Sequence, residues 1–139
     1  MTHDWLRRAD VMGRALGIRP VRLIEIDPRL PQPDSDKEAA ALLTAFDAGS
    51  FIIALDEHGD TPTSVGFAKK LESWRDQGER EIILVIGGPD GHGEAIKKAA
   101  SATFAFGNWT WPHKLARAMA AEQIYRGVSI LAGTPYHRA

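Results

Sequence analysis

Residues 81–91 read Glu-Ile-Ile-Leu-Val-Ile-Gly-Gly-Pro-Asp-Gly, and this stretch decides the predicted fold. The five consecutive apolar residues of Ile82–Ile86 are typical of a parallel strand that is buried on both faces. The glycines that follow allow the backbone to come close to a ligand. Ligands of parallel α/β sheets bind beyond the carboxyl ends of the strands, so residues 87–91 form either a ligand loop or a plain turn.

Helical and extended patterns alternate on both sides of this strand. We expect helices over residues 4–16, 36–46, 61–77, 94–102 and 113–127, and further strands over residues 21–26, 51–55 and 103–106. The alternation predicts an α/β fold with a mainly parallel sheet. A chain of 139 residues without repeats fits one domain, residues 1–139.

Composition narrows the class of protein but does not identify a function. Hydrophobic residues make up 44% of the chain and charged residues 25%, which is ordinary for a soluble globular protein. There is no cysteine, and the five histidines have no ligand spacing with acidic residues, so we expect no metal site. No apolar stretch has the length of a membrane span or a signal peptide, which predicts a cytoplasmic protein without a membrane partner. The formal net charge of −1 gives no support to nucleic-acid binding.

A second candidate segment, residues 106–113, reads Phe-Gly-Asn-Trp-Thr-Trp-Pro-His. Two tryptophans beside a threonine offer apolar walls on which an adenine ring can stack, with backbone amides to read its edge. Composition alone favours the other interpretation, in which Trp109 and Trp111 belong to the core and His113 only opens a helix.

The C-terminal third of the chain contains two further groups of polar residues. Glu122 and Arg126 are spaced for an (i, i+4) ion pair, which is usually a solvated surface feature of small energetic value. Tyr136, His137 and Arg138 lie at the chain end, where residues are often disordered. They also have the chemistry of an aromatic platform, a proton-transfer group and a phosphate contact for RNA.

Together these segments resemble one family. The motifs are Leu55-Asp56, Ile-Gly-Gly-Pro-x-Gly at 86–91, Thr-x-Pro-His at 110–113, Glu-Gln-x-Tyr-Arg at 122–126 and Pro-Tyr-His-Arg at 135–138. Their order and spacing are similar to the ribosomal RNA large-subunit methyltransferase H family of the SPOUT superfamily. The resemblance covers roughly residues 5–139.

The resemblance implies a fold, a methyl donor and a partner. It implies a deep trefoil knot near the C-terminus whose crevice binds S-adenosylmethionine (SAM), and a homodimer whose active site uses both subunits. The implied SAM contacts are Leu55, Gly88, Gly107, Asn108, Trp109, Thr110, Trp111 and Pro112. Many relatives have smaller aliphatic residues at the two tryptophan positions, so we expect a different pocket wall here.

The implied reaction is methylation of N3 of a pseudouridine in 23S ribosomal RNA of the assembled ribosome. Residue chemistry suggests the catalytic roles: His137 handles the proton, Arg138 contacts an anion or phosphate, and Tyr136 stacks on a base. We expect structural roles for Arg117, Glu122 and Arg126 in the crevice or the dimer interface.

One feature departs from the family pattern. Members usually begin with an apolar strand ahead of the helix that corresponds to residues 4–16, and this sequence has no such strand. Either the start is assigned too far downstream, which we favour, or dimerisation or a rearranged N-terminus fills the gap. The alternatives to the predicted function are a SPOUT methyltransferase for another RNA such as a transfer RNA, a non-catalytic nucleotide-binding module that uses residues 87–91, and an inactive remnant.

Overall fold

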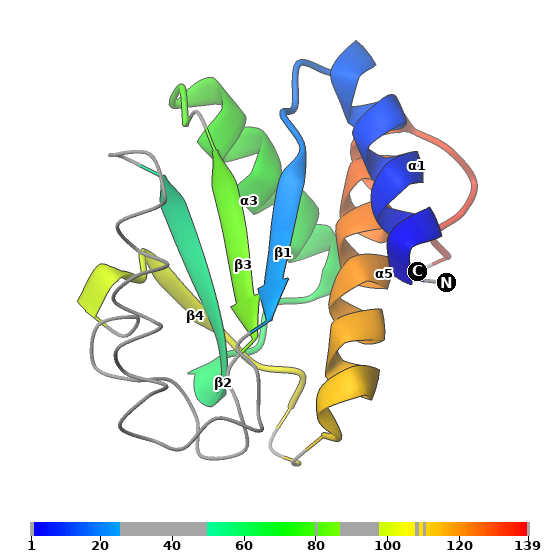
Figure 1. Cartoon of the computed structure of the whole chain (residues 1–139). Coiled ribbons are helices and arrows are strands. Elements are labelled where there is room, and N and C mark those ends of the chain that lie inside the picture. The colour runs from blue at the N-terminus through cyan, green and yellow to red at the C-terminus, as the bar shows by residue number, and fades with distance from the viewer. Residues whose placement is uncertain are drawn as a thin grey trace.

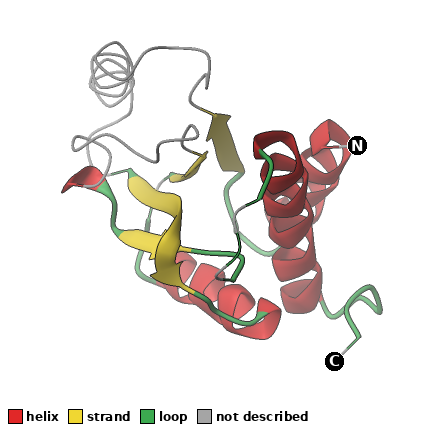
Figure 2. Ribbon diagram, turned by 90° about the horizontal axis from the view of Figure 1, so that it is seen from below, coloured by secondary structure: helices red, strands yellow, loops and turns green. Residues whose placement is uncertain are grey.

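The structure is a computed structural model that describes residues 2–25, 50–79, 81–86, 98–107, 109 and 111–138. The elements within these residues are α1 (Thr2–Ala15), β1 (Val21–Glu25), β2 (Phe51–Asp60), α3 (Ser64–Asp76), β3 (Ile82–Ile86), β4 (Ala102–Phe104) and α5 (His113–Ala132). Figure 1 shows the strands as one sheet, with α3 and α5 on the same side of it and α1 against α5. Figure 2 gives the same arrangement from below.

The sheet is parallel throughout its four described strands, in the order β1-β3-β2-β4. All five residues of β3 are buried, and the strand pairs with β1 on one side and β2 on the other. The prediction of a parallel strand buried on both faces is therefore confirmed. The predicted α/β class with a mainly parallel sheet is confirmed as well.

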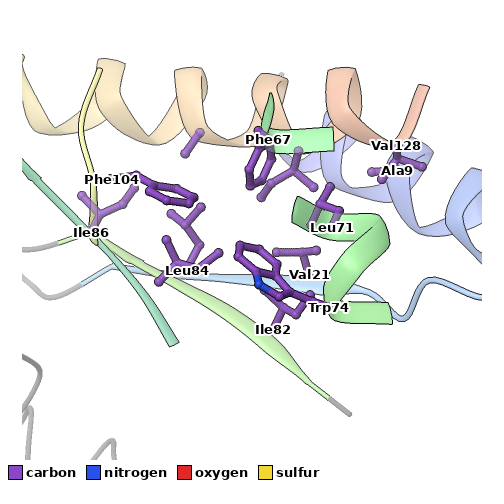
Figure 3. Close-up of a cluster of buried hydrophobic side chains, with 13 residues drawn as sticks. Ala9, Val21, Phe67, Leu71, Trp74, Ile82, Leu84, Ile86, Phe104 and Val128 are labelled. Atoms are coloured by element: carbon purple, nitrogen blue, oxygen red, sulfur yellow. The ribbon is translucent and has the colours of Figure 1, made fainter. Parts of the chain in front are cut away.

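The buried residues of β3 divide between two clusters because successive side chains of a strand point to opposite faces. Ile82, Leu84 and Ile86 join the large core under α3 and α5, which is drawn in Figure 3. Ile83 and Val85 belong to a smaller cluster with Ile52 and Ala54 of β2. The helices thus cover one face of the sheet with an apolar core.

The expected end of the last helix at Gly127 is wrong. Helix α5 continues to Ala132 and ends at Gly133, whose φ of 75° is left-handed. Gly127 serves packing instead, since a Cβ added to it would lie 3.0 Å from Leu71 and 3.2 Å from Phe67 of α3. The missing side chain lets the two helices approach closely, and a glycine inside a helix is tolerated for such a reason.

The other predicted elements agree with the structure in position more than in length. The strand expected over residues 51–55 extends to Asp60, and the strand expected over residues 103–106 lies at Ala102–Phe104. The helix expected over residues 36–46, the turn at 87–91 and the first four residues of the helix expected over 94–102 lie outside the described residues. Of the rest of that helix, residues 98 and 99 are helical and Ala102 already belongs to β4.

The start of α3 provides a first test of local stability. Thr63 is the N-cap residue, and its Oγ1 accepts a hydrogen bond of 2.9 Å from the backbone N–H of Gly66. We expect Thr63→Ala to lower the free energy of unfolding by about 1 kcal/mol, because that N–H loses its acceptor. Urea denaturation measures the change. Thr61→Ala, two residues earlier and also exposed, is the matched control and should leave the midpoint unchanged.

Candidate functional site

Leu55, the first of the predicted SAM contacts, lies beside the ends of two neighbouring strands. Leu55 of β2 is in register with Ile86 at the end of β3 and with Phe104 at the end of β4. Strands β3 and β4 therefore both end beside Leu55, whereas β2 continues to Asp60. Gly88, Asn108 and Thr110 themselves lie outside the described residues.

The described part of the β4–α5 loop, residues 105–107, 109, 111 and 112, has an open aromatic surface. Gly107 has a φ of 104°, a conformation that favours glycine. Trp111 is partly buried, and its Nε1–H donates to the backbone oxygen of Phe106 at 3.3 Å. Trp109 is 77% exposed, with its ring centroid 6.3 Å from that of Trp111. The interpretation of both tryptophans as core residues is therefore wrong for Trp109.

Helix α5 links this loop to the C-terminal tail, residues 134–138. It begins at His113, directly after the exposed Pro112. After Gly133 the chain reverses, and Thr134 donates to the backbone oxygen of Ser129 through both its N–H (3.1 Å) and its hydroxyl (3.3 Å). The tail then runs back beside α5 toward the start of α1 (Figure 1).

Tyr136 attaches the tail to α5 and α1. Its hydroxyl donates to Oε1 of Glu122 at 2.9 Å. Its ring centroid lies 4.7 Å from that of Tyr125 and 5.7 Å from that of Trp5. Burial, followed by the hydrogen bond to Glu122, raises the pKa of Tyr136 above its usual value, so the hydroxyl stays protonated at neutral pH.

Glu122, Arg126 and His137 continue the same network. Arg126 donates to Oε1 of Glu122 from Nε at 2.9 Å and pairs with it through Nη2 at 2.7 Å. The hydrogen bond to Glu122 is the main cause that raises the pKa of Arg126. Nη1 of Arg126 lies 3.0 Å from Nδ1 of His137. The predicted ion pair is present, but with side chains only 25% and 22% exposed it anchors the tail and is not a solvated surface pair.

Within the described residues, the loop and the tail are attached to different parts of α5. Glu122, where the tail is attached, lies ten positions after Pro112 in the sequence. At 1.5 Å of rise per residue, the two attachment points lie about 15 Å apart along the helix axis. We call the loop residues and the tail residues two half-sites, because they are attached at different points along the same helix.

Comparisons with known proteins bear on what these half-sites do. A family model described as "Predicted SPOUT methyltransferase" matches residues 9–137. A protein of Hyphomonas neptunium is 48% identical over 139 residues, which are 100% of this chain and 88% of that protein. A protein of Caulobacter sp. strain K31 is 46% identical over 135 residues, covering 97% of this chain and 86% of that protein. Both relatives are named ribosomal RNA large subunit methyltransferase H.

The chain belongs to the ribosomal RNA large subunit methyltransferase H family. The family assignment made from the motifs is confirmed, and with it the methyltransferase class.

For a methyltransferase H chain, the network around the tail includes one residue that the motifs did not indicate, Trp5. Trp5 and Tyr125 pack on Tyr136, and the Trp5 and Tyr125 ring centroids are 5.0 Å apart. The helical spacing of Trp5 predicted only an apolar face. Arg138 is exposed at the end of the tail, and Arg117 is exposed on α5.

The described part of this methyltransferase H chain lacks two further features, a metal cluster and a membrane-spanning helix. It contains no cluster of three or more His, Cys, Asp or Glu side chains suited to a metal ion. Its helices include none with the length and apolar character needed to cross a membrane.

Proposed function

We propose that this protein transfers a methyl group from SAM to N3 of a pseudouridine in 23S ribosomal RNA of the assembled ribosome. The relatives' names support the ribosomal RNA part of the proposal. The observation that supports it for this chain is that β3 and β4, which precede the predicted contacts Gly88 and Gly107 in the sequence, both end beside Leu55 of β2.

The described residues of the β4–α5 loop have the chemistry that SAM binding needs. Trp109 and Trp111 offer apolar surface for the adenine ring. Gly107 leaves room for a ligand because, among the described residues other than its chain neighbours, no atom lies within 4 Å of the position that a Cβ would take. We propose that Leu55, Gly88 and residues 107–112 line the SAM crevice, and that the chain forms the family's trefoil knot around it. SAM supplies an electrophilic methyl group; the protein supplies position.

We propose further that the protein acts as a homodimer in which the tail of one subunit completes the crevice of its partner. The separation of about 15 Å between Pro112 and Glu122 supports this arrangement, because it places the attachment of the tail away from the loop of the same chain. An isologous dimer has two such composite sites.

The roles of the tail residues follow from their contacts. His137 and Arg138 meet the target base and its phosphate, and Tyr136 positions them through Glu122, Tyr125 and Trp5. This role replaces the stacking role that the sequence suggested for Tyr136, because its ring already packs on two other aromatic rings. Glu122 and Arg126 position the tail and do not contact the substrate.

The test offers labelled SAM to ribosomes that lack the modification, with assembled ribosomes and free large subunits side by side. The expected result is label in a pseudouridine of 23S ribosomal RNA, with assembled ribosomes as the better substrate. Label in a transfer RNA instead would contradict the ribosomal target. Absence of label in every RNA, together with thermal stabilisation by nucleotides but not by SAM, would favour a nucleotide-binding module.

A further inference from the structure

We propose that His137 is held as a neutral imidazole with its proton on Nε2, and that it donates a hydrogen bond to the target base instead of removing the base's proton. The inference rests on the proposed function, because it assigns a step in that reaction. It differs from the sequence-based hypothesis, in which His137 handles the proton.

The contact between Arg126 and His137 determines which ring nitrogen of His137 carries the proton. A guanidinium has five N–H donors and no acceptor. At 3.0 Å from Nη1 of Arg126, Nδ1 of His137 must therefore be the acceptor. Only a neutral ring has a lone pair on Nδ1, and its remaining proton is then on Nε2. The contact thus selects one of the two neutral tautomers.

Glu122 and Tyr136 hold Arg126 in this orientation. Its Nε and Nη2 are both bonded to Glu122, and its guanidinium carbon lies 4.9 Å from the centroid of the Tyr136 ring. The Glu122 hydrogen bond raises the pKa of Arg126, so the group remains a cation and a donor. Nε, Nη2 and one face of the guanidinium are therefore already in contact with other groups, and Nη1 is directed at His137.

The tail itself is held in place through Tyr136. Tyr136 packs against both Trp5 of α1 and Tyr125 of α5, and its hydroxyl is bonded to the same Glu122 oxygen that accepts from Arg126. One carboxylate therefore fixes both the residue before His137 and the residue that bonds its ring. Glu122 and Arg126 are positioning residues for His137.

The chemistry of the reaction has a use for such a donor. When N3 of the base loses its proton to water or hydroxide, negative charge spreads to the two flanking carbonyl oxygens. The N3 electron pair then forms the bond to the methyl carbon, the carbon–sulfur bond breaks, and its electron pair stays on the sulfur as a neutral thioether. An Nε2–H aimed at one carbonyl oxygen stabilises the anion, whereas removal of a proton needs a free lone pair that this tautomer lacks on Nε2.

The activity test compares two substitutions of His137. Glutamine keeps a side-chain N–H donor but is not a base, and alanine keeps neither. We expect His137→Gln to retain methyl transfer within about tenfold of the wild type, and His137→Ala to lose about 10²- to 10³-fold, the usual effect of removing one oxyanion donor. Equal losses in the two variants would overturn the donor role.

The spectroscopic test needs neither RNA nor methyl transfer, so its failure is separate from failure of the proposed function. Imidazole ¹⁵N–¹H correlation spectra of the full-length protein at neutral pH report the tautomer, and the His137 signals are identified by their loss in His137→Gln. We expect the Nε2–H tautomer in the wild type and a mixture of both tautomers in Arg126→Met, with the other histidine signals retained as a check of folding. A wild-type ring that carries its proton on Nδ1, or on both nitrogens, would overturn the inference even if ribosomes are methylated.

Discussion

Replacing Glu122 with alanine should lower kcat for methyl transfer by about 10²-fold or more while SAM affinity stays near the wild-type value. Glu122 holds Tyr136 at 2.9 Å and Arg126 at 2.7 Å, so its loss releases both contacts that fix the tail. SAM binding should persist because the predicted crevice lies about 15 Å away along α5. Methyl transfer to ribosomes and calorimetry with SAM measure the two quantities.

Two variants control this experiment. Glu72→Ala removes an exposed carboxylate from α3 and should leave both quantities unchanged. Glu122→Gln keeps an oxygen that accepts hydrogen bonds from Tyr136 and Arg126, so it should recover part of the lost rate. A Glu122→Ala protein with full kcat, or one in which SAM affinity alone falls, would contradict the role of Glu122 in positioning the tail.

Leu71→Ala should cause the largest loss of stability among the single substitutions considered. Leu71 is fully buried in the core between the sheet and α5, and it packs where Gly127 lets α3 and α5 approach (Figure 3). We expect the free energy of unfolding to fall by about 2–5 kcal/mol, since a buried leucine loses its transfer energy and leaves a cavity. Urea or thermal denaturation measures the loss.

The matched control lies on the same helix. Val65 of α3 is 38% exposed, and Val65→Ala should change the free energy of unfolding by less than about 1 kcal/mol. If Leu71→Ala were no more destabilising than Val65→Ala, the core described between α3, α5 and the sheet would be wrong.

The parallel sheet was predictable from the sequence because its signal is local. Ile82–Ile86 has no polar residue, so only a strand with both faces buried fits it, and the structure has this strand between two parallel neighbours. The helix end predicted at Gly127 was wrong because the sequence signal for it is also only local. A local pattern cannot distinguish a glycine that ends a helix from one that faces another helix, and here Phe67 and Leu71, which lie far from it in sequence, decide the outcome.

The candidate site was predictable as a set of residues but not as an arrangement. The sequence indicated Glu122, Arg126 and the tail, yet their contacts depend on the reversal after Gly133. Trp5 was missed because its partner Tyr136 stands at the opposite end of the chain. The exposure of Trp109 was not predictable either, because composition describes what tryptophan usually does and not where a loop directs it.

In the proposed homodimer, the loop of one subunit and the tail of its partner form one site for methyl transfer. The most direct test combines two inactive variants. Gly107→Val disrupts the loop, because a β-branched residue is strained at a φ of 104°, and His137→Ala disrupts the tail. Each is assayed alone on ribosomes, and then the two are refolded or coexpressed together.

We expect the mixture to regain methyl transfer at about a quarter of the wild-type rate. Half of randomly mixed dimers are heterodimers, and each heterodimer has one site with an intact loop and an intact tail. Calorimetry with SAM should detect binding in His137→Ala but not in Gly107→Val. A mixture as inactive as either variant alone, although the heterodimer is present, would contradict the composite site.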